Sequence, residues 1–323
     1  MVNFTEIELA KQTIKQWITT TPLIKSNELS EQFHCEVYLK LEQLQYTGSF
    51  KVRGVFNSLL NLNETERKKG VITASSGNHG IALAYAGMKL QTPVIVVMPK
   101  NTPTIKKHLA AKYGAKLYSH GKNYQEALQL ARLLQKKTGF KFIHSYEDDS
   151  VIVGHGTLGL EIVEQLPDCE LIITGVGGGA LFAGIAIAVK HANENIKLVA
   201  VQPKLVQTIR KSIQKGSPVK VPVGRTTIAD GLATGKLGET SFEIIRRYMD
   251  IYTVVTEKEI TKSIINLLIN HKLIAEGAGA STIAALSKLQ RNVIENKKIV
   301  CVISGGNIDP FQLSKIIKNT NLH

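Results

Sequence analysis

The residues Leu-Ile-Ile-Thr-Gly-Val-Gly-Gly-Gly-Ala, numbered 171–180, decide the fold class of this chain. The run at 171–174 is apolar or β-branched, which is typical of a strand buried on both faces of a sheet. Glycines then end the strand, and the segment from Ala180 onward has the composition of a helix. A strand, a glycine turn and a helix in this order indicate a parallel α/β fold.

Similar strand and helix patterns occur on both sides of this stretch. Further strands are predicted at 36–41, 93–98, 198–201 and 299–303, and helices at 124–136, 179–191, 257–270 and 282–295. This alternation predicts an α/β protein with mostly parallel sheets. No linker or internal repeat is visible, so a second lobe would have to be inserted into the first. We place a small lobe at 65–147, and a large lobe at 1–64 and 148–323.

Two of these strands, and a further strand that begins near Ile72, run into turns that carry glycine and polar residues, at 72–80, 174–180 and 303–307. In open α/β sheets, ligands bind at the carboxyl ends of the strands. The three turns therefore predict one site that is assembled from several loops.

The glycine turn at 175–180 indicates a phosphate site. Glycine lets the backbone approach an anion closely, and the free N–H groups at the start of the next helix attract negative charge. The spacing of Gly175, Gly177 and Ala180 also fits a dinucleotide motif. That motif requires an acid at the end of the next strand, where this chain has Gln202. We therefore favour a single phosphate over a dinucleotide.

A lysine that could carry chemistry follows a Gly-Ser-Phe turn in the sequence QYTGSFKVRG, residues 45–54. A lysine becomes a nucleophile toward carbonyl groups when burial or a nearby cation lowers its pKa. Phe50 would provide apolar cover for Lys51, and Arg53 is a nearby cation. Since most lysines are simply solvated, this stretch alone does not identify a site.

Composition excludes several other classes of protein. The net charge is +14, but the basic residues come in pairs and triplets without interleaved aromatic residues, which argues against nucleic-acid binding. The three cysteines form no C-x-x-C pair, so we expect neither a disulfide scaffold nor a cysteine-rich zinc site, and a reducing cytoplasm fits best. We expect no secretory signal in residues 1–10 and no membrane helix.

Four motifs together resemble those of fold-type II pyridoxal-phosphate enzymes. The stretch 47–54 resembles the cofactor-lysine motif, and 75–80 resembles the substrate-carboxylate loop. The stretch 177–181 resembles the phosphate loop, and 304–307 resembles the strand end that meets the pyridine nitrogen. Their order and spacing match over almost the whole chain. The serine/threonine dehydratase and serine racemase branch is the most similar, which implies two α/β lobes with the cofactor in the cleft.

The resemblance also implies roles for the cofactor-binding residues. Lys51 would hold pyridoxal 5'-phosphate covalently and later act as the base, Phe50 would pack on its ring, and Asn78 would bind the ring hydroxyl. Ser304 would face the pyridine nitrogen. The phosphate would be bound by backbone N–H groups of Gly177, Gly178, Gly179, Ala180 and Leu181, although the family usually has a fourth glycine at position 180. We place Glu276 near the ring in preference to Asp230.

The implied substrate site is the loop made by Ser75, Ser76, Gly77, Asn78 and His79. The implied reaction is elimination of water and ammonia from L-threonine or L-serine, giving 2-oxobutanoate or pyruvate. Because Ser76 matches the second acid/base of racemases, serine racemisation is an alternative, as is dehydration of 3-hydroxyaspartate. A protein that binds a phosphate ligand without catalysis is a third possibility, against which intact Lys51, Asn78 and Ser304 argue.

The resemblance implies a homodimer or homotetramer acting on a small amino acid, without nucleic acid or membrane partners. Relatives with a divalent cation site use an acid where this chain has Gln202, so we expect no metal. We interpret the acidic run at 147–149 as a helix cap or a solvated hinge.

Overall fold

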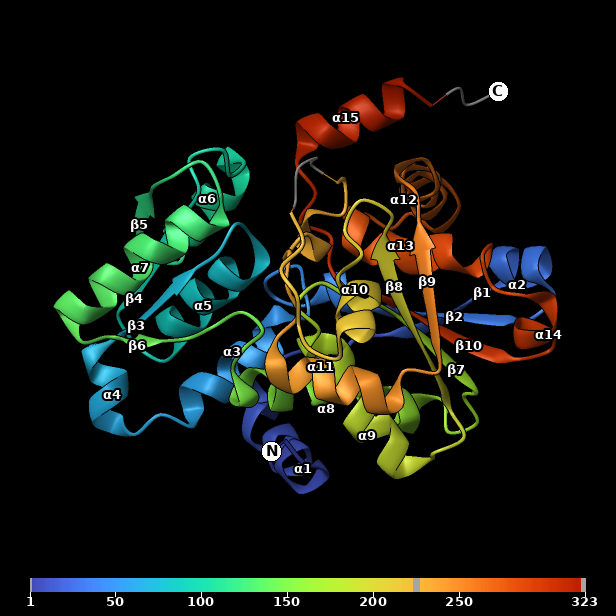
Figure 1. Cartoon of the computed structure of the whole chain (residues 1–323), viewed down its shortest axis with the longest axis horizontal. Coiled ribbons are helices and arrows are strands. Elements are labelled where there is room, and N and C mark those ends of the chain that lie inside the picture. The colour runs from blue at the N-terminus through green and yellow to red at the C-terminus, as the bar shows by residue number, and fades with distance from the viewer. Residues whose placement is uncertain (1, 223–226, 321–323) are drawn as a thin grey trace.

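Two sheets organise the chain in the computed structural model, which describes residues 2–222 and 227–320. The larger sheet has the strand order β1-β2-β10-β7-β8-β9, and the smaller has the order β5-β4-β3-β6 (Figure 1). All described strand pairs are parallel except β1 with β2. The strands are β1 Leu23–Ser26, β2 Glu36–Leu41, β3 Val71–Ala74, β4 Val94–Met98, β5 Lys116–Ser119, β6 Lys141–Phe142, β7 Leu171–Gly175, β8 Lys197–Pro203, β9 Ile251–Val255 and β10 Lys298–Ile303.

This arrangement confirms the predicted α/β class with mostly parallel sheets. The strands of the larger sheet come from both ends of the chain, and those of the smaller sheet come from the middle. The lobe boundaries at 64/65 and 147/148 stay a prediction.

Strand β10 shows why continuous apolar runs of sequence form the central strands of the larger sheet. Its alternate residues Ile299, Cys301 and Ile303 belong to one buried cluster, and Val300 and Val302 belong to another. Side chains of a strand alternate between the two faces of the sheet, so a continuous apolar run fills both cores. Burial of each such aliphatic side chain stabilises the fold by roughly 1.5–3 kcal/mol.

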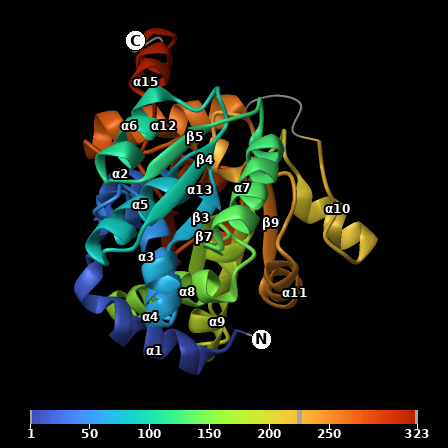
Figure 2. The same ribbon diagram turned by 90° about the vertical axis from the view of Figure 1, so that its left-hand side faces the viewer.

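The smaller sheet follows the same rule. In β4, Val94 and Val96 face the cluster that includes residues of α5, and Ile95 and Val97 face the cluster that includes residues of α7. Figure 2 shows α5 and α7 on opposite sides of this sheet.

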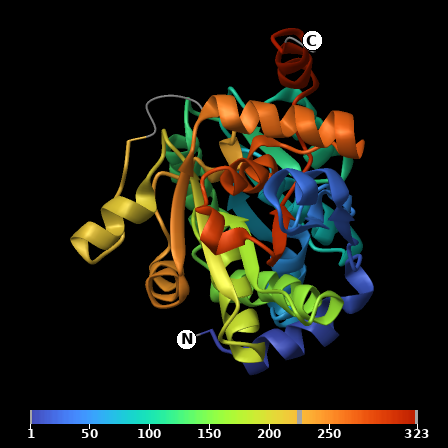
Figure 3. The same cartoon turned by 90° about the vertical axis from the view of Figure 1, so that its right-hand side faces the viewer.

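Helices cover both faces of the larger sheet. On one face α13 packs on β7, β8, β9 and β10, with α12 outside it (Figure 3), and on the other face α9 contacts β7 and packs on α8. The helices are α1 Phe4–Ile14, α2 Asn27–Phe33, α3 Lys51–Leu60, α4 Glu64–Lys69, α5 Asn78–Lys89, α6 Thr104–Lys112, α7 Tyr124–Thr138, α8 Asp149–Gln165, α9 Ala180–Ala192, α10 Thr208–Lys215, α11 Glu239–Tyr248, α12 Glu257–His271, α13 Gly277–Leu286, α14 Arg291–Ile294 and α15 Pro310–Lys318, with 3-10 turns η1 Lys15–Trp17, η2 Glu42–Leu44 and η3 Asp230–Leu232.

One predicted helix is wrong. The apolar pattern at 282–295 predicted a single helix, whereas α13 begins at Gly277, ends at Leu286 and is followed by the short α14. Every residue of α13 is buried, so it lacks the polar face that periodicity detects. A Cβ at Gly277 would lie 2.4 Å from the carbonyl oxygen of Ile228, which shows how closely this helix start packs.

The acidic run at 147–149 begins α8. The carboxylate of Asp148 accepts a hydrogen bond from the N–H of Val151 at 3.3 Å, the contact of a helix N-cap. The interpretation of this run as a cap is therefore confirmed.

Candidate active site

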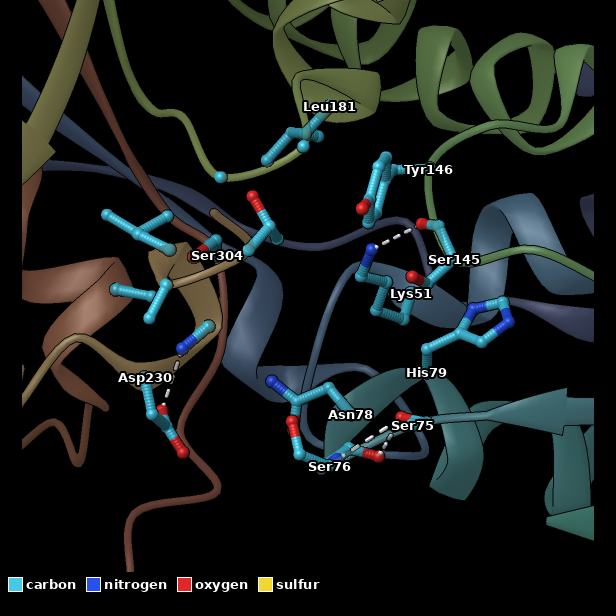
Figure 4. A pocket seen from close by; sticks show the side chains of 18 of the residues that line it. Lys51, Ser75, Ser76, Asn78, His79, Ser145, Tyr146, Leu181, Asp230 and Ser304 are labelled. Atoms are coloured by element: carbon cyan, nitrogen blue, oxygen red, sulfur yellow. Dashed lines mark hydrogen bonds between the residues drawn. The ribbon is translucent and has the colours of Figure 1, made fainter. Parts of the chain in front are cut away.

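One pocket lies where strands of both sheets end, and the predicted site residues line it (Figure 4). The smaller sheet provides the loop after β3, and the larger sheet provides the loops after β7 and β10. The predicted residues in its wall are Phe50, Lys51, Ser75, Ser76, Gly77, Asn78, His79, Gly177, Gly178, Gly179, Ala180, Leu181, Glu276 and Ser304. The sequence therefore identified residues that the fold brings together from separate segments.

Lys51 is held at the start of α3 by contacts with the end of β10. Ser49 forms an isolated antiparallel bridge with Gly305, and the N–H of Phe50 donates to the carbonyl of Ser304 at 3.0 Å. These backbone contacts fix the first turn of α3 beside Ser304. The Nζ of Lys51 lies 4.9 Å from the centre of the Phe50 ring.

The environment of Lys51 favours its neutral amine. Burial lowers the pKa of Lys51 to about 8, while the nearby Glu276 opposes this shift. Its Nζ donates to the carbonyl of Ser145 at 2.9 Å. Arg53 does not explain the shift, because buried contacts with Glu42 and Glu161 neutralise its charge. Desolvation thus makes Lys51 a better nucleophile and base near neutral pH.

Asn78 and Glu276 meet across the pocket. Asn78 begins α5, and its Nδ2 donates to Glu276 Oε1 at 2.7 Å. The Oδ1 of Asn78 accepts from Asn307 Nδ2 at 2.9 Å, so the amide is fixed in one orientation. Nδ2 has a second hydrogen besides the one that it donates to Glu276.

Glu276 is a buried carboxyl group with an unusual pKa. Burial raises the pKa of Glu276 to about 7 and Asp230 adds to the shift, while Lys106, Asn78 and Lys51 act in the opposite direction. Its Oε2 is buried and has no protein partner within the described part of the chain. The group can therefore hold or release a proton close to Lys51 at neutral pH.

The turn that precedes Lys51 requires glycine at position 48. Gly48 has φ +70°, a left-handed conformation that L side chains rarely adopt. A Cβ there would lie 2.4 Å from the Oδ1 of Asn307. The Gly-Ser-Phe turn can therefore bring Lys51 into the pocket only with glycine at this position.

The loop after β3 presents one free hydroxyl and one that is used internally. The Oγ of Ser75 accepts from the N–H groups of Gly77 and Gly80 at 3.2 and 3.0 Å, so it shapes the loop. Ser76 is exposed, and its side chain lies at the pocket wall (Figure 4).

His79 is neutral in this loop. Burial, with a smaller effect of the Lys51 charge, lowers the pKa of His79 to about 3. Its Nε2 lies 3.2 Å from the carbonyl oxygen of Ile143, so Nε2 carries the hydrogen and Nδ1 is an acceptor. His79 lines the pocket without adding positive charge to it.

The glycine turn after β7 has backbone where side chains would otherwise stand. A Cβ at Gly178 would lie 2.1 Å from Cγ of Tyr146, and one at Gly177 would lie 2.8 Å from the carbonyl oxygen of Gly231. The turn leads into α9, whose first N–H groups have no partner within the helix. These N–H groups form a cradle for an anion at the positive end of the helix dipole.

Sequence reasoning missed several residues of the pocket wall. Lys106, Tyr124, Ser145, Tyr146 and Thr234 line the pocket but belong to no motif. They lie in loops or at the start of helices, and nothing in their local sequence distinguishes them. Asp230, the residue we favoured less, also lies in the wall.

Gln202 forms a polar contact network in place of the acid of some relatives. Its Nε2 donates to the carbonyl of Val176 at 3.0 Å and to Thr208 at 2.7 Å, and its Oε1 accepts from the N–H of Ile209 at 2.9 Å.

Over residues 2–222 and 227–320, no cluster of three or more His, Cys, Asp or Glu suits a metal ion. Across the same residues, no helix is both long enough and apolar enough to cross a membrane.

Known proteins resemble the chain over nearly its whole length. The sequence profile of a family described as "Pyridoxal-phosphate dependent enzyme" matches residues 14–305. The L-threonine ammonia-lyase of Thermotoga maritima is 41% identical, over 98% of this chain and 78% of that protein. Threonine deaminase isoform 2 of Solanum lycopersicum, in its processed form, has a TM-score of 0.93 at 34% identity, covering 99% of this chain and 88% of that one. Serine racemase of Dictyostelium discoideum has a TM-score of 0.89 at 36% identity, covering 95% and 99%.

Proposed function

Because the chain belongs to the family of pyridoxal-phosphate dependent enzymes, we propose that it deaminates L-threonine or L-serine by β-elimination. Threonine yields 2-oxobutanoate and ammonia, and serine yields pyruvate and ammonia. The observation that carries this proposal is the position of Lys51, whose pKa is about 8, in one pocket with the glycine cradle and the loop at 75–79.

The pocket fits pyridoxal phosphate. The cradle at Gly177–Gly179 has no room for side chains and presents backbone N–H groups, which suits a phosphate. The amine of Lys51 would bind the aldehyde, and the hydroxyl of Ser304, which lines the same pocket, would face the ring nitrogen. The second N–H of the Asn78 amide would donate to the ring hydroxyl, and Phe50 provides an apolar surface beside the lysine. Ala180 and Leu181 extend the cradle with their N–H groups.

When bound, this cofactor supplies an electron-withdrawing ring that stabilises negative charge on the α-carbon of the substrate. The residues of the chain bind and orient the substrate and accept its α proton. The N–H groups of the loop at 75–79 and the hydroxyl of Ser76 would bind the substrate carboxylate, which would orient the α C–H bond. Once the substrate amine has taken its place, the Lys51 amine is free to accept the α proton at Nζ.

Loss of the β-hydroxyl completes the elimination. The hydroxyl would leave as water with a proton that Lys51 Nζ can return after accepting the α proton, and the released enamine would tautomerise and be hydrolysed to the 2-oxo acid and ammonia. Glu276 would control the charge near the ring hydroxyl through its contact with Asn78.

Serine racemisation is the second candidate for this site. Its support is the exposed hydroxyl of Ser76 in the pocket wall, from a residue that matches the second acid/base of racemases. The two reactions share the cofactor contacts, so they differ in whether a proton returns to the α-carbon or the hydroxyl leaves.

The test is an absorbance spectrum of the purified protein, followed by assays of 2-oxo acid release from L-threonine and L-serine. We expect a yellow protein that releases 2-oxo acid, and we expect Lys51→Ala to lose both properties. Lys68→Ala, at an exposed lysine of α4, is the matched control and should keep both. A yellow protein that forms D-serine without 2-oxo acid would move the proposal to racemisation, and a protein that stays colourless with added pyridoxal phosphate would refute it.

We also propose a cytoplasmic homodimer or homotetramer. The support is the family resemblance, together with exposed Leu44, Tyr46 and Phe311, which a second subunit would cover. Light scattering of the purified protein tests the oligomeric state, and fractionation of the cells that produce it tests the cytoplasmic location.

A further inference from the structure

An ion pair joins the two sides of the pocket at a distance from Lys51. Lys106 of α6, which packs beside the smaller sheet, places its Nζ 2.7 Å from Oδ2 of Asp230 in η3. The lysine side chain is 5% exposed, whereas that of Asp230 is 50% exposed. Both residues line the pocket, and neither is needed for the chemistry described above.

The pair lies next to the space that a substrate would occupy. A Cβ on Gly77, in the loop assigned to the substrate carboxylate, would lie 3.2 Å from Lys106 Nζ. Both Lys51 and Lys106 interact electrostatically with Glu276. In the view of Figure 4, Asp230 lies on the far side of Asn78 from Lys51. A substrate held by its amine near Lys51 and by its carboxylate near Gly77 therefore has the ion pair beside it.

The charges of the pair balance. Burial opposes the charged form of Lys106, but the carboxylates of Asp230 and Glu276 outweigh it and raise the pKa of this lysine. An uncharged side chain, such as that of threonine or serine, meets a neutral ion pair. A side-chain carboxylate meets the half-exposed carboxylate of Asp230, while the cation beside it, Lys106, is already paired.

We propose that Asp230 is a specificity-determining residue that excludes amino acids with anionic side chains by occupying Lys106. This inference rests on the proposed function and assigns its substrate class, the uncharged β-hydroxy amino acids. Specificity of this kind is set by a repulsive group against the wrong ligand. Without the Asp230 charge, Lys106 becomes a buried cation without its partner and attracts a side-chain carboxylate.

The test compares kcat/KM for L-threonine and L-threo-3-hydroxyaspartate in the holoenzyme and in Asp230→Asn. We expect the ratio of hydroxyaspartate to threonine to rise by about 10-fold or more, which corresponds to one good charge contact. Asp230→Ser should shift the ratio in the same direction, and adding Lys106→Met to Asp230→Asn should abolish the gain. Asp250→Asn is the matched control, because Asp250 pairs with Lys190 at 3.0 Å away from the pocket, and it should leave the ratio unchanged.

A binding measurement separates this inference from the proposed function. Calorimetric titration with succinate, at fixed ionic strength, should show about 10-fold tighter binding to Asp230→Asn than to the wild-type protein. An unchanged substrate ratio and unchanged succinate affinity in both Asp230 variants overturn the inference, even if threonine is turned over. Failure of the wild-type protein to deaminate threonine or serine overturns the proposed function, and the succinate titration then decides the inference alone.

Discussion

At the scale of single residues, Glu276 shows how burial creates a group that titrates near neutrality. Its carboxyl group contacts Asn78 within a pocket that also holds two lysines. Burial outweighs the attraction of these lysines, which is why the pKa rises from 4.5 to about 7. Lys51 shifts in the complementary direction, so the two groups exchange protons with solvent over nearly the same pH range.

We predict that Glu276→Gln removes a pH dependence of stability. A carboxyl group whose pKa is raised in the folded protein stabilises it below pH 4.5, and this contribution is lost as pH rises through about 7. The free energy of unfolding of the wild-type protein should therefore fall relative to the variant between pH 5 and pH 7.5, by roughly 1–3 kcal/mol.

Denaturant unfolding of both proteins at the two pH values measures this difference. Glu64→Gln, at an exposed ion pair of α4, is the control and should follow the wild-type protein. Parallel curves for the wild-type protein and Glu276→Gln would contradict the predicted shift.

At the scale of elements, a buried charge network orients α3 and hence Lys51. Arg53 of α3 contacts Glu42 of η2 at 2.8 Å and Glu161 of α8 at 2.7 Å. Lys40 of β2 contacts the other oxygen of Glu161 at 2.8 Å. Two cations and two anions thus balance in the interior, and each depends on the others for its partner.

We predict that Arg53→Met destabilises the protein by about 3–5 kcal/mol, because it leaves the buried Glu42 without a cation and removes one of the two cations that contact Glu161. Arg291→Met is the matched control. Its pair with Glu295 is exposed, so the loss should be about 0–1 kcal/mol. Chemical denaturation measures both, and equal losses in the two variants would show that the network does not stabilise α3.

At the scale of the whole molecule, the site exists only because two sheets meet. The loop at 75–79 follows the smaller sheet, and the cradle at 177–181 follows the larger one. Asn78 and Lys106 reach from the first to Glu276 and Asp230 of the second. A ligand bound between the sheets therefore contacts both and would hold them together.

We predict that removing the cofactor loosens the pocket loops without loosening the central strands. Hydrogen exchange of the amides at 75–79 and 177–181 should increase by 10-fold or more in the cofactor-free protein. The amides of β2 and β10, in the centre of the larger sheet, are the internal control and should change little. Uniform acceleration over the whole chain would instead indicate that the cofactor stabilises the fold globally.

The sequence by itself determined the local features of this protein. Apolar runs predicted β4, β7, β8 and β10 to within two residues at each end, since burial on both faces leaves a continuous pattern. The glycine turn at 177–179 carries a signal within a few residues, whereas Lys51 was singled out only by the resemblance of four motifs in order. The beginning of α13 was missed, since a helix buried on every side has no polar face.

Only the tertiary structure decided which distant residues meet. Asn78 and Glu276 are 198 residues apart, and Lys106 and Asp230 are 124 apart, yet both pairs form across the pocket. Periodicity reports whether a side chain is buried, but it does not report which loop faces which. The partners, and with them the pKa values and the charge balance of the pocket, depend on how the two sheets are placed against each other.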